Sequence, residues 1–429
     1  MARMSRDLMM EVLLEWNNWE GKGKTGIARG SYLAEIRRKI AAGEVLVIGG
    51  VRRCGKSTLA RQFMEGRGDA KNSVMINFED VRLAGMEPEG VLRMFEAYLS
   101  EIQPEGKPLL VLDEVQNVKG WERLASQLHE MGRADIIVTG SSSKLLSGEY
   151  ATLLTGRHLD VRAFPLSFRE YLGFCGIEMP SRVAILKNKA RIMKLAREYL
   201  EFGGFPKAAL TADTRLRIEL LAAYYDDIIH KDIAKRHSIM QIRKLDDLAK
   251  FFLSNNSRLM SLNKAKNVVG LSLDSVERFS RHMEDAYLVF FAPIFSYSKK
   301  VQIVNPKKVY SIDTGLRNAV CFRFSKDYGW NAENAVFLDA VRRGYKVHYH
   351  SDGKTECDII ALKGKERLAI QVSWELKDEV REIAGLVSAM KTIKAREGWL
   401  VAEDAEEERK AGKMKIHIVP LWKWLLREE

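Results

Sequence analysis

A glycine-rich octapeptide constrains this chain more than any other feature. Residues 50–57 read Gly-Val-Arg-Arg-Cys-Gly-Lys-Ser, which fills every fixed position of the pattern G-x-x-x-x-G-K-[ST]. The apolar run 45–48 before it predicts a buried strand, and residues 58–63 after it predict the start of a helix. A loop between a strand and a helix directs backbone N–H groups at phosphate oxygens. The sequence therefore predicts a nucleoside triphosphate site rather than an ordinary glycine turn.

The pattern assigns a role to each part of this site. Lys56 is expected to reach the β- and γ-phosphates, and the Ser57 hydroxyl is expected to ligate Mg²⁺. The predicted cofactors are ATP and Mg²⁺. The predicted nucleotide-binding residues of the loop are Gly50, Val51, Arg52, Arg53, Cys54, Gly55, Lys56, Ser57 and Thr58.

A second motif follows about sixty residues later. Residues 108–112 are apolar and end in Asp113 and Glu114, as a buried parallel strand does when it delivers acids to the edge of a sheet. Many strands end in acidic turns, but this spacing from the loop favours a functional pair. Asp113 is expected to hold Mg²⁺, and Glu114 is expected to act as the general base on the attacking water.

A third apolar strand, residues 136–138, leads into a hydroxyl-rich stretch. In nucleotide-hydrolysing ring proteins the strand beside the acidic one presents a polar side chain to the γ-phosphate or the water. Ser141 or Ser142 fits this catalytic role, and the sequence does not choose between them. The alternative is a turn that caps the next helix.

Several longer phrases resemble one family. These sequence segments are "LLVLDEVQNVKGWE" (109–122), residues 138–147, "TGR" (155–157) and "FPLSFREYL" (164–172). They look like the AAA-type ATPases of archaea and bacteria that carry a C-terminal region of unknown function and are related to the STAND signalling ATPases. The resemblance runs over most of the chain, and its most specific motifs lie before residue 210.

The resemblance implies two further site residues. Arg157, in the "GR" pair, is implied as an arginine finger, which often comes from a neighbouring subunit and would make the protein a homo-oligomer. The alternative for Arg157 is a surface salt bridge. The segment 202–206, "FGGFP", resembles the G-x-P motif that STAND relatives place beside the nucleotide, which implies Pro206. Its alternative is a helix C-cap.

Length and composition favour a large cytoplasmic protein. A chain of 429 residues predicts two to four domains. No apolar run approaches the ~18 residues that a membrane helix needs, and the charged N-terminus makes a secretory signal improbable. The four cysteines are scattered without CxxC spacing, so they predict neither a zinc site nor disulfides.

Basic residues are concentrated in the middle of the chain. Residues 211–330 hold 20 basic and 13 acidic side chains, whereas residues 331–429 hold 18 of each. A local basic excess is typical of nucleic-acid binders. Within this region the sequence predicts helices at 245–255, 262–269 and about 272–286, then strands at 288–294, 301–304 and 309–312.

Three helices followed by a basic hairpin predict a winged helix-turn-helix that binds duplex DNA. The third helix would be the recognition helix, and the hairpin would be the wing near phosphates. In many AAA-type and STAND proteins, however, such a domain packs on the nucleotide and never touches DNA. The candidate DNA-binding residues are Arg278, Arg281, Lys299, Lys300, Lys307 and Lys308.

The last hundred residues resemble the PD-(D/E)xK nuclease fold. A helix carries Glu333, and predicted strands at 347–350, 357–362 and 368–372 carry Asp358 and Gln371. The expected Glu-x-Lys pair reads Gln371-Val372-Ser373, which replaces a metal-binding carboxylate and removes the catalytic lysine. A nuclease-like domain that has lost catalysis is the preferred interpretation.

The predicted fold class is α/β, with a P-loop parallel sheet, a helical lid, a winged helix-turn-helix and a nuclease-like α/β domain. The preferred function is an ATPase that binds duplex DNA as an oligomer. The alternatives are an ATP-dependent signalling switch on a protein partner, without DNA, and an ATP-gated nuclease. The predicted domains are 1–24 (N-terminal helix), 25–165 (ATPase core), 166–240 (lid), 241–320 (winged helix) and 321–429 (nuclease-like domain).

Overall fold

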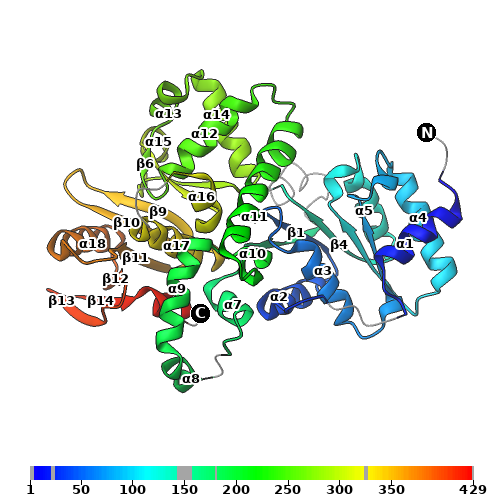
Figure 1. The fold of residues 1–429 in the computed structure, drawn as a ribbon, viewed down its shortest axis with the longest axis horizontal. Coiled ribbons are helices and arrows are strands. Elements are labelled where there is room, and N and C mark those ends of the chain that lie inside the picture. Colours follow the sequence, from blue (N-terminus) through cyan, green and yellow to red (C-terminus); the bar gives the residue numbers. More distant parts are fainter. Residues whose placement is uncertain (1–3, 21–24, 143–156, 179–180, 323–326, 428–429) are drawn as a thin grey trace. The chain divides into compact units, whose positions relative to one another are not determined.

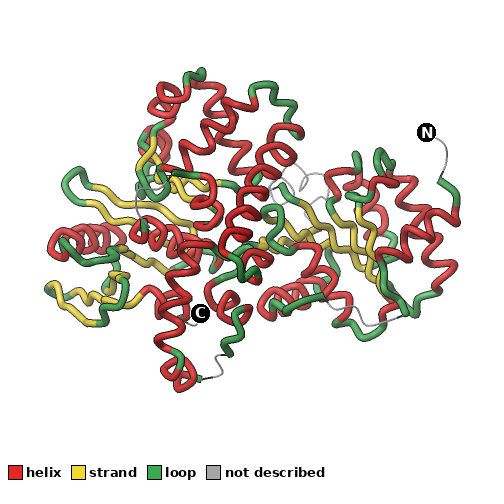
Figure 2. Tube along the Cα trace, in the orientation of Figure 1, coloured by secondary structure: helices red, strands yellow, loops and turns green. Residues whose placement is uncertain are grey.

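The computed structural model describes residues 4–20, 25–142, 157–178, 181–322 and 327–427. The chain divides into two compact units, Met1–Ala163 and Phe164–Glu429. Figure 1 colours the first unit blue to cyan and the second green to red, and Figure 2 distinguishes their helices from their strands.

The first unit alternates strands with helices. Its elements are α1 (Arg6–Trp16), α2 (Gly30–Ile40), β1 (Val45–Gly50), α3 (Lys56–Glu65), η1 (Ala70–Asn72), β2 (Ser73–Asn77), η2 (Val81–Leu83), α4 (Pro88–Ile102), β3 (Leu109–Asp113), η3 (Val115–Asn117), α5 (Trp121–Glu130), β4 (Asp135–Gly140) and β5 (His158–Ala163).

The described strands of this unit form one parallel sheet in the order β2-β3-β4-β1-β5. Strands β1, β2 and β3 are buried along their whole length, because helices cover both faces of a parallel sheet. The predicted parallel sheet is confirmed. Strand β4 lies between β1 and β3, so the ends of the glycine-rich and acidic strands flank the end of β4.

The N-terminal segment closes one edge of this sheet. Helix α1 buries Met9, Val12 and Leu13 in the core of the first unit. Beyond it, Asn17 exchanges two hydrogen bonds with the backbone of Met75 in edge strand β2, at 2.9 and 2.7 Å. The indole of Trp19 donates to the carbonyl of Ser73 at 2.9 Å. These side chains satisfy backbone groups that an edge strand would otherwise expose.

The second unit mixes helices with two sheets. Its elements are α7 (Phe168–Phe174), α8 (Arg182–Lys187), α9 (Lys189–Phe202), α10 (Pro206–Leu210), α11 (Thr214–Asp227), the π-helix η5 (Ile228–Lys235), α12 (Ile242–Ser254), β6 (Leu259–Met260), α13 (Leu262–Val269), α14 (Leu273–Asp285), β7 (Val289–Ala292), α15 (Lys299–Val304), β8 (Lys307–Ser311), α16 (Thr314–Val320), α17 (Tyr328–Arg342), β9 (Lys346–Ser351), β10 (Glu356–Lys363), β11 (Glu366–Val372), α18 (Glu379–Ile393), β12 (Glu397–Ala402), β13 (Glu407–Ala411), β14 (Met414–Pro420) and α19 (Leu421–Leu426).

The basic segment of the second unit holds helices α12, α13 and α14 and a small antiparallel sheet in the order β6-β8-β7. Ser261 and Ser272 cap α13 and α14, and Gly270 ends α13 with a positive φ of 67°. One local prediction is wrong, because residues 301–304 belong to helix α15 and not to a strand. The connection between β7 and β8 is therefore not a simple basic hairpin.

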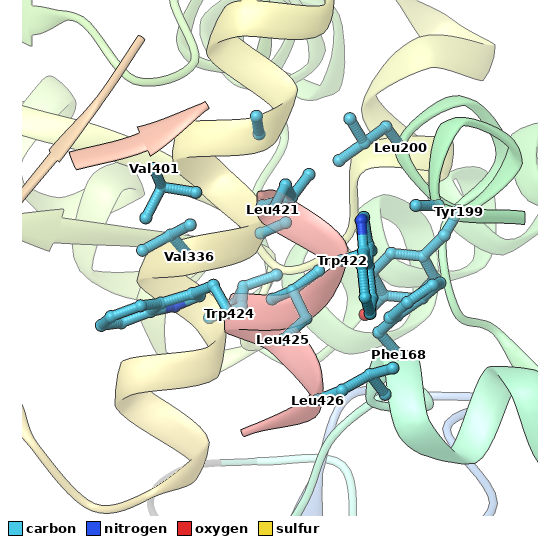
Figure 3. Close-up of a cluster of buried hydrophobic side chains, with 14 of the residues drawn as sticks. Phe168, Tyr199, Leu200, Val336, Val401, Leu421, Trp422, Trp424, Leu425 and Leu426 are labelled. Atoms are coloured by element: carbon cyan, nitrogen blue, oxygen red, sulfur yellow. The ribbon is translucent and has the colours of Figure 1, made fainter. Parts of the chain in front are cut away.

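The C-terminal sheet has the order β13-β14-β12-β11-β10-β9. Strands β9, β10 and β11 are antiparallel, and β11, β12 and β14 are parallel. Helix α19 buries Trp422 and Trp424 beside Phe168, Tyr199 and residues of α17 (Figure 3). This cluster joins the start and the end of the second unit into one core.

Across the residues that the structure describes, no helix combines the length and the apolar composition needed to cross a membrane.

Candidate nucleotide site

The glycine-rich loop is held between β1 and α3 by close backbone contacts. A Cβ added to Gly50 would lie 2.1 Å from the carbonyl oxygen of Ala163 in the adjacent strand β5. Gly55 has a φ of +100° and is the N-cap of α3. Only glycine fits both positions without strain. The two glycines of the motif therefore determine the path of the loop backbone.

Lys56 lies at the first turn of α3 and is buried, with 4% of its surface exposed. Its ammonium is 3.3 Å from the carbonyl of Val51 and 3.6 Å from Oε1 of Glu114. The Cys54 thiol, also in the loop, donates to the carbonyl of Ala163 at 3.4 Å, and burial raises its pKa. Lys56 therefore stands between the loop and the acidic strand, where a phosphate would interact with its charge.

The Asp113 carboxylate lies at the end of β3 and faces α3. Its Oδ1 accepts a hydrogen bond from the Ser57 hydroxyl at 2.9 Å and another from Thr139 at the end of β4. Its Oδ2 is buried and has no hydrogen-bond partner. Burial raises the pKa of Asp113, and the two hydroxyl bonds oppose that shift. A hydroxyl and an unsatisfied carboxylate oxygen side by side fit the oxygen ligands that Mg²⁺ requires.

Glu114 follows Asp113 with a strained backbone. Its φ is +57°, in the left-handed region, and 7% of its surface is exposed. Its amide donates to the Thr139 hydroxyl at 3.1 Å, and its carboxylate accepts from the Gln116 amide. Such strain persists where the surroundings fix the residue, which is common at functional sites.

The structure adds residues that the motifs did not indicate. Thr139 bonds both Asp113 and Glu114, although the sequence directed attention to the serines after it. Arg29, which precedes α2, is 4% exposed, and its guanidinium donates to the carbonyl of Cys54 at 3.0 Å. The sequence could have indicated Thr139, because it lies at the end of a predicted strand. Arg29 belongs to no sequence motif, so nothing in the sequence indicated its role.

Ser141 and Ser142 directly follow β4 and are both buried. They lie at the carboxyl ends of the strands, as the glycine-rich loop and Asp113 do, because the carboxyl ends of parallel strands lie on the same side of a sheet. Both serines therefore remain candidates for the contact to the γ-phosphate or the water.

Arg157 lies at the opposite end of the strands, near the start of β1 and not near its carboxyl end. The next residue, His158, pairs with Val45 at the start of β1, whereas the loop follows Gly50 at its end. Five residues of strand separate the two positions by roughly 16 Å. Arg157 forms an ion pair with Glu130, and both side chains are about half exposed. Arg157 therefore lies too far from the loop of its own subunit to contact a phosphate there.

Pro206 and its glycines lie in the second unit. Pro206 is the first residue of α10. The amide of Gly204 donates to Oδ2 of the buried Asp313 at 2.7 Å, and a Cβ on Gly203 would lie 1.9 Å from Oδ1 of the same carboxylate. Oδ1 also accepts from the Leu316 amide at 2.9 Å. Gly203 is thus required for packing against the N-cap of α16, and Gly204 for packing against the backbone of Leu166, whose carbonyl oxygen would lie 2.4 Å from an added Cβ.

The candidate DNA-binding residues divide into two groups. Arg278 and Arg281 on α14 are exposed, as are Lys299 and Lys300 on α15, and Lys307 is partly buried. Lys308 does not reach the surface. It is 6% exposed, and its ammonium lies 2.9 Å from Oε1 of Glu333 and 2.7 Å from Oδ1 of Asp358. Assigning Lys308 to DNA was wrong, because its ammonium pairs inside the fold with the buried Glu333 and the partly buried Asp358.

The two carboxylates of the nuclease-like pattern, Glu333 and Asp358, therefore share the single positive charge of Lys308. Glu333 also accepts from the Tyr310 hydroxyl at 2.8 Å, and Oδ2 of Asp358 accepts from the Val372 amide at 3.0 Å. The Gln371 amide oxygen accepts from the Asp358 amide at 3.0 Å. Within the described residues, no group of three or more His, Cys, Asp and Glu side chains is placed to hold a metal ion.

Comparison with known proteins identifies the family. An AAA domain model matches residues 42–172, and a domain of unknown function, DUF8612, matches residues 193–327. The uncharacterized protein MJ1544 of Methanocaldococcus jannaschii is 32% identical over 416 residues, which cover 91% of this chain and 90% of that protein. This chain belongs to the family of MJ1544. An uncharacterized protein of Haemophilus influenzae is 30% identical over 375 residues, 85% of this chain and 91% of that protein.

Both matches cover at least 85% of the chain and therefore extend over sequence from both units. Residues 42–172 of this member form an AAA-type P-loop ATPase domain. Among solved structures, the Walker-type ATPase PABY2304 of Pyrococcus abyssi aligns with 13% identity and a TM-score of 0.48, covering 68% of this chain and 95% of that chain. AMPPCP-bound DnaA of Aquifex aeolicus aligns with 19% identity and a TM-score of 0.24, covering 64% and 91%.

Proposed function

We propose that this AAA-type ATPase binds duplex DNA as an oligomer and couples ATP turnover to DNA binding or remodelling. The observation that carries the proposal is a set of exposed basic side chains, Arg278 and Arg281 on α14 and Lys299 and Lys300 on α15. They lie in a segment with the element order helix, strand, helix, helix, strand, helix, strand, from α12 to β8. Exposed cations on such a segment fit the phosphate backbone of a duplex.

The pairing of the small sheet supports a winged helix-turn-helix. Strand β6, between α12 and α13, pairs with β8, which also pairs with β7. In this interpretation α14 is the recognition helix and the β7–β8 connection is the wing. The wing carries the helix α15 and offers Lys299, Lys300 and the partly buried Lys307 to phosphates.

The ATP site would hydrolyse the γ-phosphate bond through the residues that surround Asp113. In this mechanism Ser57 and Asp113 would hold Mg²⁺, which would neutralise phosphate charge. Lys56 neutralises the same charge from the loop, and Glu114 accepts a proton from the attacking water. Ser141 or Ser142 contacts the γ-phosphate or that water.

Arg157 would complete the site of a neighbouring subunit. The roughly 16 Å between its end of the strands and the loop supports a role in trans. A guanidinium supplied by a neighbour stabilises charge on the transferring phosphoryl group. This arrangement makes the active form a homo-oligomer.

The C-terminal part of the second unit would be a nuclease-like domain without catalysis. The order α17, β9, β10, β11, α18, β12 supports the PD-(D/E)xK interpretation. Gln371 and Ser373 stand where the catalytic carboxylate and lysine are expected, and Lys308 occupies the space between Glu333 and Asp358. A binding or packing role follows.

A signalling switch on a protein partner is the second candidate. It is favoured by exposed apolar side chains on or near α15, with exposed fractions of 81% for Tyr297, 70% for Ile303 and 69% for Val304. Apolar groups in this position suit a protein surface better than a phosphate backbone.

The test is the ATP turnover rate with and without duplex DNA at low salt. Glu114→Gln serves as the blank. Turnover should rise with DNA in the wild type and lose that response in a variant with Arg278, Arg281, Lys299 and Lys300 replaced by Ala. An ATP turnover rate that DNA does not change at any protein concentration would reject DNA coupling and favour the signalling switch.

A further inference from the structure

An open hollow lies at one end of the C-terminal sheet. Its volume is about 590 Å³, and it is formed by the turn between β10 and β11, the end of α18 and the start of β12. Four basic residues line it together with the indole of Trp399, namely Lys365, Arg367, Lys394 and Arg396.

The hollow has an excess of positive charge, because its four basic residues outnumber its two acidic ones, Glu366 and Glu397. Among the described residues, Lys365, Lys394 and Arg396 have no carboxylate within ion-pair distance, while Arg367 donates to the carbonyl of Ile393 at 3.0 Å. The two acidic side chains that line the hollow have other partners. Glu366 accepts from the Tyr345 hydroxyl at 2.6 Å, and Glu397 lies 3.4 Å from Nε2 of His417.

The aromatic floor of the hollow is fixed in place. The Trp399 ring stacks on His417 with centroids 4.5 Å apart, and it meets the edge of Trp424 at 5.4 Å. A fixed indole among cations offers a stacking surface for a base and charges for the adjoining phosphates. A duplex keeps its bases stacked inside, and an acidic peptide has no base to place on the indole.

We propose that this hollow binds single-stranded nucleic acid. It is a separate site from α14 and α15, so the inference goes beyond the DNA coupling proposed above. It also lies at the opposite end of β10 and β11 from Asp358 and Gln371, since Lys363 pairs with Glu366 at the turn. The hollow therefore holds a strand without placing it at the nuclease-like carboxylates.

The test is the binding of a fluorescein-labelled 20-nucleotide oligothymidylate, followed by anisotropy at several salt concentrations. Replacing Lys365, Lys394 and Arg396 with Ala should weaken binding about tenfold or more and reduce the log–log salt slope by about 2, because each single-strand phosphate contact contributes roughly 0.7. The matched control replaces Lys354, Lys377 and Arg381, which are exposed side chains near the other end of the same sheet. It removes the same charge and should change the affinity less than threefold.

A second comparison tests the role of the indole without changing the protein. An abasic oligomer with the same number of phosphates should bind the wild type at least about fivefold more weakly, because base–aromatic stacking contributes roughly 1–3 kcal/mol per base. Equal binding of the two oligomers, equal binding of polyglutamate, or equal losses in both triple variants would overturn the proposal. The variant that lacks the basic residues of α14 and α15 should bind the oligothymidylate normally, which separates this site from the proposed duplex site.

Discussion

At the scale of single residues, the nucleotide site depends on two adjacent carboxylates in different environments. Asp113 is almost fully buried against the Ser57 and Thr139 hydroxyls, whereas Glu114 has a left-handed backbone and contacts Lys56 and Gln116. The first arrangement suits a metal ligand, and the second suits a group that exchanges a proton with water.

Glu114→Gln should therefore retain ATP binding and lower turnover by about 100-fold or more, because it removes the proposed base and leaves the phosphate contacts. Turnover by phosphate release and binding by a fluorescent ATP analogue check this. Glu96→Gln, an exposed carboxylate on α4, should change neither. Unchanged turnover in Glu114→Gln would exclude Glu114 as the base.

Lys308 is the residue whose environment differs most from the sequence prediction. Lys308→Met should destabilise the second unit by about 3–5 kcal/mol, because the buried Glu333 and the partly buried Asp358 would lose their cation. Urea unfolding followed by circular dichroism measures the loss. The exposed Lys299→Met should stay within about 0.5 kcal/mol of the wild type. Equal stabilities of the two variants would show that the ion cluster does not stabilise the fold.

At the scale of elements, close backbone contacts set where strands and helices meet. Gly50→Ala should displace β5 from β1 and weaken both folding and ATP binding, because its Cβ would lie 2.1 Å from the Ala163 carbonyl. An overpacked site of this kind costs about 1–3 kcal/mol. The control is Gly66→Ala at the other end of α3, whose nearest contact would be an ordinary 3.4 Å. Similar thermal midpoints for both variants would contradict this account.

The contact between the "FGGFP" segment and α16 predicts a pH dependence. Burial raises the pKa of Asp313 to about 6 from its ordinary value of 3.8. The folded state then holds a proton between these values and the unfolded state does not. Stability contributed by this group is therefore greatest below pH 3.8 and is lost as the pH rises through about 6, by up to about 3 kcal/mol.

Asp313→Asn removes this titration and also places an amide group near the Gly204 N–H. The variant should have a lower free energy of unfolding than the wild type at every pH. The difference between the two proteins should decrease as the pH rises from 4 to 7. Thermal unfolding of both proteins across this range measures the difference. A disadvantage that stays constant or grows with pH would show that Asp313 titrates normally in the folded protein.

At the scale of the whole molecule, the position of Arg157 makes a prediction about assembly. Arg157→Ala and Glu114→Gln should each be inactive alone if the arginine acts on a neighbour. An equal mixture should recover about a quarter of wild-type turnover, because one in four randomly assembled interfaces joins an intact arginine to an intact site. Turnover no greater than the sum of the separate variants, in a mixture shown by light scattering to exchange subunits, would reject action in trans.

Much of the first unit could be predicted from the sequence. The strand–loop–helix around residues 50–57 and the strand that ends at Asp113 are local patterns, because a buried parallel strand reads as a continuous apolar run and the loop needs glycine at fixed positions. The AAA domain match supports the same interpretation. Arg29 and Thr139 illustrate the limit, since their roles depend on partners 25 and 26 residues away.

The sequence by itself determined the phosphate-binding loop, the acidic strand and the parallel sheet, since each follows from the chemistry of neighbouring residues. Only the tertiary structure decided that Lys308 is internal, that residues 301–304 are helical and that Arg157 lies at the opposite end of the strands from the loop. These outcomes depend on which distant carboxylates, strands and apolar surfaces meet in the fold. A lysine adjacent to another lysine looks like a surface residue until the fold brings Glu333 and Asp358, 25 and 50 positions away, into contact with its ammonium.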